Sequence, residues 1–215
     1  MKKVIITLSL FAFITVMAAQ SNRDYDIQII IKDTAINDIE KLDLVLLDKY
    51  AKVYQQKDAN GSYFEYDLTF TEDGIKTRIN GDTRHGFVVE QTLPRQAFFK
   101  ILKTYYPNGY LKMKGKLLGG GLTIVGEWEF YDENGQLTHV VNEDKKFGKF
   151  GYYELLLFLY QQGYIDLETG ENRGVANFVY NVEKKQWTVD VFVGTWYSFT
   201  IDGETGEVLS KKGLR

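Results

Sequence analysis

The residues whose types could support catalysis are few and isolated in this sequence. The chain has no cysteine and only two histidines, His85 and His139. Neither histidine has a carboxylate or a hydroxyl at a spacing that suggests a catalytic triad, and no serine lies in a Gly-x-Ser-x-Gly turn. We therefore expect no nucleophilic active site, and the sequence favours a protein that is not an enzyme.

Metal sites have little support in the sequence as well. Zinc needs three or four His, Cys or carboxylate ligands, and two isolated histidines do not provide them. Calcium is the better candidate, because residues 166–171 and 202–207 each place three carboxylates in six residues. Both segments lack the full ligand series of an EF-hand loop, and Asp-x-x-Thr-Gly is also a good turn sequence. We expect two turns, no bound metal and no cofactor.

Paired carboxylates for glycoside hydrolysis stay open as an alternative, since acidic residues are abundant and their separation in space is not visible in a sequence. The simpler interpretation is that the acidic residues of the central segment solvate one face of a strand. These residues are Glu127, Glu129, Asp132 and Glu133.

A group of aromatic residues is the feature best suited to a binding surface, because aromatic side chains dominate interface hot spots and stack on sugars. The group comprises Tyr105, Tyr106, Tyr110, Trp128, Phe130, Tyr131, Tyr152 and Tyr153. One residue in two along a strand faces inward. Trp128 and Phe130 share the parity of Leu122 and Ile124, so we assign them to the core. Tyr110 and Tyr131 are predicted to be reachable and form the candidate binding site.

The N-terminal residues predict export. Lys2 and Lys3 precede an apolar run over residues 4–16, and two small alanines follow, which is typical of a secretory signal peptide. The apolar run is shorter than the ~20 residues that span a bilayer. We expect residues 1–19 to be removed and the mature chain, periplasmic or extracellular, not to be embedded in a membrane.

Composition narrows the class of protein further. Removal of the two leader lysines takes the formal charge from −3 to −5, with no long basic stretch, so we expect no nucleic-acid partner. Without cysteine no disulfide forms, and an apolar core must stabilise the fold. An aromatic content of 15% and 20 glycines against two prolines favour half-buried strands and turns, hence a mainly β (α+β) fold.

Asn-Gly pairs mark the expected strand reversals, because Asn-Gly readily takes the positive φ angles of tight hairpins. The pairs lie at residues 60–61, 80–81, 108–109 and 134–135. Residues 62–71 alternate apolar and polar types and predict a strand with one solvated face. A first strand is expected from residue 27 to residue 32, whereas residues 35–47 fit a helix or a strand equally well.

The central segment repeats itself, which indicates an array of similar units. Residues 105–111 are echoed by residues 130–137, and their Asn-Gly pairs are 26 positions apart. A second echo, at a spacing of 22, relates residues 126–131 to residues 148–153. Each unit predicts a strand, an Asn-Gly turn and a returning strand.

These repeats resemble the MORN-variant family, whose units run Gly-x-(aromatic)-x-(aromatic)-Tyr, an Asn-Gly turn and a leucine. The resemblance covers residues 99–153, and the best-formed unit is residues 126–137. It implies an antiparallel sheet of hairpins. Bacterial proteins with such repeats are often labelled antitoxin-like, which implies that the partner is another protein.

The C-terminal segment predicts a second unit. Residues 153–162 indicate a short helix with Gly163 just past its end. Three alternating strands follow, at residues 176–182, 187–193 and 197–201. This order, closing on Ile-Asp-x-x-Thr-Gly-Glu-Val-Leu, resembles the small PepSY-type module of secreted proteins.

The expected organisation is a signal peptide over residues 1–19, an antiparallel β domain over residues 20–152, and a helix with a small antiparallel β unit over residues 153–215. The expected function is non-catalytic binding or scaffolding in the cell envelope, with another protein as the partner. Two alternatives stay open: a periplasmic immunity protein that neutralises a toxin, and a binder of glycans or small ligands.

Overall fold

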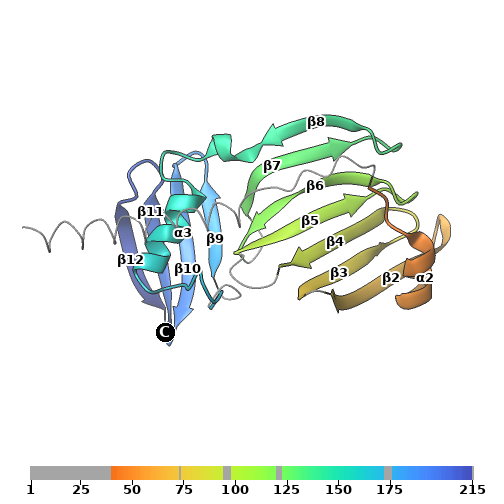
Figure 1. The fold of residues 1–215 in the computed structure, drawn as a ribbon, viewed down its shortest axis with the longest axis horizontal. Helices are drawn as coiled ribbons and strands as arrows, with labels where there is room; N and C mark the ends of the chain where they lie inside the picture. The colour runs from red at the N-terminus through yellow and green to blue at the C-terminus, as the bar shows by residue number, and fades with distance from the viewer. Residues whose placement is uncertain (1–39, 73, 94–97, 120–122, 172–175, 215) are drawn as a thin grey trace, which may run out of the picture. The chain divides into compact units, whose positions relative to one another are not determined.

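The fold comes from a computed structural model (Figure 1), which describes residues 40–72, 74–93, 98–119, 123–171 and 176–214. The predicted signal peptide and the predicted strand at residues 27–32 lie outside the described residues. The described chain forms an eight-stranded sheet and a four-stranded sheet, both antiparallel. The predicted mainly β fold is therefore confirmed.

The eight strands of the larger sheet follow one another in chain order, so each strand pairs with its neighbours in sequence. This is a meander of hairpins, the arrangement that the repeats predict. The strands are β1 (Lys52–Asp58), β2 (Gly61–Glu72), β3 (Ile75–Asp82), β4 (Gly86–Thr92), β5 (Phe99–Tyr105), β6 (Leu111–Leu118), β7 (Thr123–Tyr131) and β8 (Leu137–Asn142).

Three of the four Asn-Gly pairs lie at strand reversals, as predicted, and the fourth does not. The pair at residues 80–81 lies inside β3, and the chain turns at residues 83–85 instead. A Cβ atom on Gly81 would lie 2.2 Å from the backbone oxygen of Gly86. The glycine at this position is needed for the close approach of two strands rather than for a turn.

The two hairpins 26 residues apart have the same geometry. In the β5–β6 turn the amide of Tyr106 donates to the oxygen of Tyr110 at 2.8 Å, and in the β7–β8 turn the amide of Asp132 donates to the oxygen of Gln136 at 3.0 Å. The hairpins also bond to each other, because the Tyr106 hydroxyl donates to the oxygen of Tyr131 at 3.0 Å. The first echo in the sequence is thus a structural repeat.

The second echo is not a structural repeat. Residues 143–146 form a 3-10 helix (Glu143–Lys146), and the helix α3 (Tyr152–Gln161) begins where a further strand was predicted to end. The glycines and aromatics of residues 148–153 match the repeat in type only. The amide of Gly151 donates to the Glu154 carboxylate at 2.9 Å, an interaction that starts a helix.

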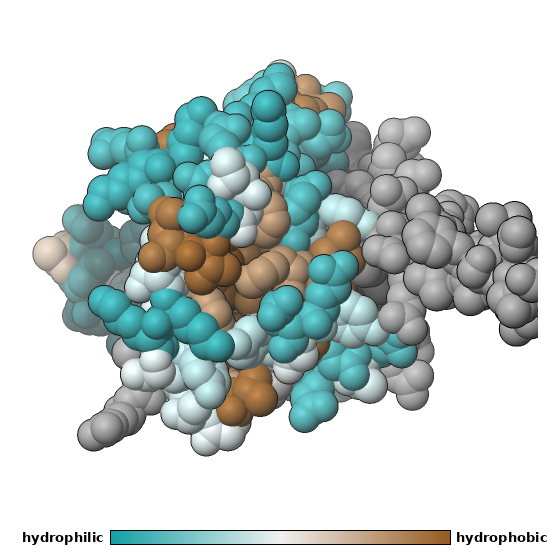
Figure 2. Space-filling view, turned by 90° about the vertical axis from the view of Figure 1, so that its left-hand side faces the viewer, coloured by the Kyte–Doolittle hydropathy of each residue, from teal (hydrophilic) through white to brown (hydrophobic). Residues whose placement is uncertain are grey.

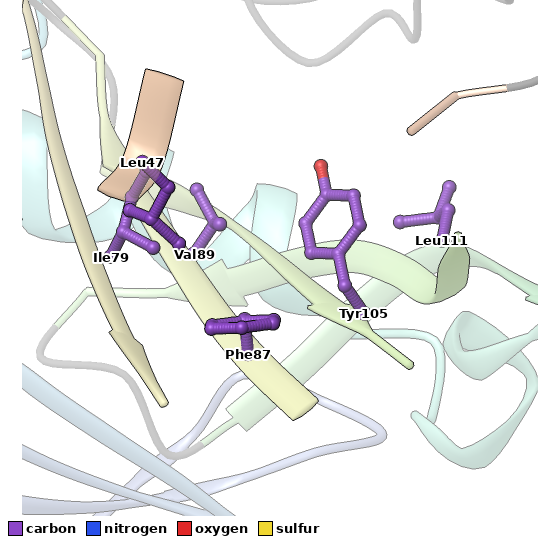
Figure 3. Packing of buried hydrophobic residues seen from close by; sticks show 6 residues of the cluster. All are labelled: Leu47, Ile79, Phe87, Val89, Tyr105 and Leu111. Carbon is purple, nitrogen blue, oxygen red and sulfur yellow. The ribbon is translucent and has the colours of Figure 1, made fainter. Parts of the chain in front are cut away.

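Residues 35–47 fitted a helix or a strand equally well in the sequence. The structure shows that the last of them belong to a short helix, α2 (Leu44–Tyr50). One leucine of α2, Leu47, packs with residues of β3, β4, β5 and β6 in a buried cluster (Figure 3). The other members are Ile79, Phe87, Val89, Tyr105 and Leu111. In Figure 3 the Tyr105 ring stands up from its strand with the hydroxyl at its outer end.

The C-terminal unit packs α3 on the four-stranded sheet. Its strands are β9 (Asn177–Asn181), β10 (Gln186–Val193), β11 (Thr195–Asp202) and β12 (Val208–Leu214), in the order β12-β11-β10-β9. The predicted helix is confirmed with a shift of one residue. The fourth strand, β12, was missed because Lys211, Lys212 and Gly213 interrupt the apolar alternation.

Candidate functional site

The two tyrosines of the predicted site lie in adjacent hairpins, and each is half-buried. Tyr110 forms a backbone bridge to Lys41, whose ammonium lies 4.5 Å from the centre of the Tyr110 ring. Tyr131 ends β7 and packs against the buried cluster under α2. Both side chains are therefore partly committed to the fold.

Tyr105 and Tyr131 occupy equivalent places in the two matched hairpins, and each donates its hydroxyl to a glutamate. Tyr105 donates to Glu40, which also accepts from the Lys103 ammonium at 2.7 Å. Tyr131 donates to Glu129, whose carboxylate lies 3.1 Å from the Lys114 ammonium. The equivalent tyrosines of the two hairpins thus each belong to a Tyr-Glu-Lys cluster, although the glutamates and lysines come from positions that do not match in the repeat.

The environment of these clusters favours the charged forms of Glu40 and Lys114. Burial alone would raise the pKa of Glu40, but the hydrogen bonds from Lys103 and Tyr105 and the nearby lysine charges outweigh it and lower this pKa. Burial would lower the pKa of Lys114, but its contacts with Glu129 and Tyr131 raise it. Burial, reinforced by the Glu40 carboxylate, raises the pKa of Tyr105.

Each charge in the two clusters has an opposite charge beside it, so the arrangement fastens segments together rather than presenting a free acid or base. Glu40 bonds to the sheet from outside it, and its backbone oxygen also accepts from the amide of Leu111 at 3.2 Å. Lys103 and Lys114 face each other across β5 and β6. The two glutamates neutralise what would otherwise be a repulsive cross-strand pair.

The central acidic residues do more than solvate a strand. Glu129 belongs to the second Tyr-Glu-Lys cluster, and the Asp132 carboxylate accepts from the amides of Asn134 and Gln136 at 2.9 Å each. These two residues therefore have structural roles beyond the solvating role that was predicted for them. Glu127 and Glu133 are exposed, as expected.

The two histidines lie in separate structural surroundings. The exposed ring of His85 contacts Asp82 in the β3–β4 turn at 2.9 Å. The His139 ring stacks parallel to Phe130, with 4.6 Å between ring centres. Trp128 is buried as predicted, whereas Phe130 is only half-buried under His139.

The two acidic hexapeptides form the same turn, as predicted. The Asp166 carboxylate accepts from the amides of Glu168 and Thr169, at 2.7 and 3.0 Å. The Asp202 carboxylate accepts from the amides two and three residues ahead at 2.9 and 2.8 Å. Each aspartate carboxylate is thus hydrogen-bonded to backbone amides of its own turn. Over the residues that the structure describes, no three His, Asp or Glu side chains gather as a metal site.

The strand β8 ends the larger sheet and is the most exposed strand of the matched hairpins. β8 pairs with β7 alone, and all six of its residues are exposed. Three are large and apolar: Leu137, Val140 and Val141. The strand contains no Lys, Arg, Asp or Glu. The sequence analysis missed this site because it considered Leu137 only as the leucine that ends the repeat unit of residues 126–137.

The opposite edge of the same sheet, β1, is also exposed along its whole length but is charged. Lys52, Lys57 and Asp58 lie on it, and Asp58 forms an ion pair with Arg84 at 2.5 Å. Charged side chains on an edge strand discourage the addition of another strand. Only the β8 edge of this sheet, as far as the described residues go, lacks that protection.

The comparisons with known proteins give no relative for this chain. No family model matches it, and neither the curated proteins nor the solved structures contain a similar one. Among the helices of the described residues, none has the length and apolar character needed to cross a membrane.

Proposed function

We propose that this chain is an exported, non-catalytic protein that binds another protein by accepting one of its strands at β8. The observation that supports the proposal is the fully exposed, uncharged β8 edge. Export is supported by the signal-peptide pattern of residues 1–19. The resemblance to MORN-variant repeats supports an array of hairpins as the binding scaffold.

The chemistry of binding would be that of strand addition. An edge strand leaves every second set of backbone amide and carbonyl groups without a partner in its own sheet. A strand of the partner would pair with these groups, which supplies affinity, and its alternating side chains would contact those of β8, which supplies specificity.

The β8 side chains select the kind of strand that fits. Val140 pairs with Glu129 of β7 and Val141 with Trp128, so the two valines point to opposite faces of the sheet. A partner strand beside them would place apolar, β-branched residues next to both valines at little cost. Charged residues at these positions would be desolvated without an opposite charge, so we expect a neutral partner strand.

The test is a pair of matched substitutions in the tagged mature chain. Val140→Lys places a charge on the β8 edge, and Val53→Lys places the same charge on the β1 edge; these valines are 46% and 39% exposed. Capture from the cell envelope of the source cell should give one stoichiometric protein for the wild-type and Val53→Lys chains, and a strong loss of it for Val140→Lys.

Two results would contradict the proposal. Capture that survives Val140→Lys but is lost in the Tyr110→Ala/Tyr131→Ala chain would place the binding site on the hairpin tyrosines. A wild-type chain that captures no protein and instead dimerises through β8, as judged by sedimentation, would make a second copy the occupant. If the captured protein is a toxin, the chain is the immunity protein of the alternative given above, and the toxin is its partner.

A further inference from the structure

The outer face of the four-stranded sheet carries an exposed pair of aromatic rings. Phe192 and Trp196 face each other across β10 and β11, with 5.5 Å between ring centres and 59° between ring planes. Trp196 is 40% exposed, whereas Trp128 and Trp187 are 4% and 0% exposed. Exposure of a tryptophan forfeits a large burial energy, so an exposed paired tryptophan is a candidate anchor for a ligand.

Polar side chains continue the same face away from the aromatic pair. Asp190 pairs with Ser198 one step along β10 and β11, and Lys212 of β12 pairs with Ser198 from the other side. Since direct cross-strand partners share a face, and so do residues two apart, these three side chains lie beside the aromatic pair. Within the described chain the side-chain polar groups of these three residues form no hydrogen bond or ion pair, so they are available to a ligand.

The opposite face of the sheet packs in the core of the unit, so the face with the aromatic pair points outward. Trp187, Val189 and Phe199, the alternating residues of β10 and β11, are buried. Figure 2, which looks from the side where the four-stranded unit lies in Figure 1, shows hydrophobic side chains gathered among hydrophilic ones. On the platform face, the rings of Phe192 and Trp196 lie beside the polar side chains of Asp190, Ser198 and Lys212, a mixture that suits a ligand with both apolar and hydroxyl-bearing surfaces.

We propose that this face, defined as the Trp196 platform (Phe192, Trp196, Asp190, Ser198 and Lys212), binds a neutral carbohydrate chain. A pyranose ring presents C–H groups on its faces and hydroxyls at its rim. Its face would stack on Trp196 and Phe192, and its hydroxyls would donate to Asp190 and accept from Lys212. Neighbouring strands are about 4.8 Å apart and residues two apart along a strand about 6.6 Å, so one sugar unit reaches from the rings to the polar row.

The charges around the platform favour a sugar over a lipid surface. Asp190 lies beside the aromatic pair on the same face, two residues from Phe192, and would be pressed against anionic headgroups if the rings entered a membrane. The proposal does not depend on strand addition at β8, which lies on the other sheet.

The test uses an array of neutral hexaoses (cellohexaose, chitohexaose, maltohexaose, xylohexaose and mannohexaose) with the mature chain. We expect at least one to bind and to change the fluorescence of Trp196. In calorimetry, Trp196→Ala should weaken that ligand roughly tenfold or more, and Asp190→Asn, an isosteric change, should weaken it several-fold. Phe64→Ala, which removes an exposed aromatic ring from β2, is the matched control and should leave the affinity unchanged.

Each other outcome overturns the proposal. No binding to any glycan of the array, or glycan binding that Trp196→Ala leaves intact while the variant keeps the wild-type circular dichroism spectrum, would show that the platform is not a sugar site. Trp196-dependent binding to vesicles of mixed zwitterionic and anionic lipids, without glycan binding, would make it a membrane contact. None of these results bears on whether β8 accepts a strand.

Discussion

The two sheets expose different parts of themselves to solvent. In the four-stranded unit a helix covers one face, and the buried residues of α3, Leu155, Leu156 and Leu159, pack in the same unit as the fully buried Trp187. In the eight-stranded sheet the helix α2 has only seven residues, and both edge strands are exposed throughout. The smaller sheet therefore offers a side-chain surface, and the larger sheet offers a backbone edge.

This difference follows from how each sheet is stabilised. The smaller sheet relies on one dense core. The larger sheet adds hairpins in chain order, each bonded to the previous one, so the array can end at any strand and the last one is left open. The side-chain charge of the edge strand decides whether such an array accepts another strand. The two ends differ in this respect, because β8 is uncharged and β1 carries charged residues.

The largest effect should come from the core of the smaller sheet. Trp187→Ala removes a fully buried ring whose indole N–H donates to the oxygen of Phe150 at 2.9 Å. We expect a loss of about 3–5 kcal/mol in the free energy of unfolding, measured in urea. Trp196→Ala should lose less than about 1 kcal/mol, because the ring is partly in water. Equal losses would contradict the assignment of one ring to the core and one to a surface.

A smaller loss is expected where the larger sheet is tightly packed. A Cβ atom on Gly115 of β6 would lie 2.2 Å from the Trp128 ring, whereas one on Gly213 of β12 would meet nothing within 4 Å. Gly115→Ala should therefore cost about 1–3 kcal/mol, and Gly213→Ala should be neutral or slightly stabilising. Thermal unfolding of the two variants checks this, and a neutral Gly115→Ala would mean that the Trp128 ring lies elsewhere.

The Tyr-Glu-Lys clusters predict a pH dependence of the larger sheet. The pKa of Glu40 is lowered in the folded chain, so its contribution to stability is present above its unfolded pKa, about 4.3, and is lost as the pH falls through the folded value. Glu40→Gln should cost about 1 kcal/mol at pH 7 and less at pH 3. The free energies of unfolding of the wild-type and Glu40→Gln chains at pH 7 and pH 3 test this expectation. An equal loss at both pH values would show that the Glu40 carboxylate charge is not the cause.

The sequence predicted the repeating elements well, because each Asn-Gly hairpin depends on local residue types. It failed where a residue's role depends on another strand. Gly81 looks like a turn glycine but is required by the backbone of Gly86 across the sheet. Residues 148–153 copy the repeat in type, yet the leucines that follow favour a helix.

The candidate sites were harder to predict than the elements. Tyr110 and Tyr131 were chosen because aromatic residues often bind, and the contacts that half-bury them come from Lys41 and from the cluster under α2. The openness of β8 is set by the strand order, which one sequence does not reveal. Trp196 could have been noticed as an aromatic residue opposite Phe192 in a predicted hairpin, but the face it occupies depends on the register of β10 and β11.

The most direct test of strand addition is hydrogen exchange of the chain alone and bound to the protein that it captures. Binding at β8 predicts strong new protection of backbone amides within residues 137–142, with residues 52–58 of β1 unchanged. It also predicts that Val140→Lys, an exposed change costing less than about 0.5 kcal/mol of stability, removes this protection. Protection confined to residues outside β8, with β8 exchanging as in the free chain, would contradict the account.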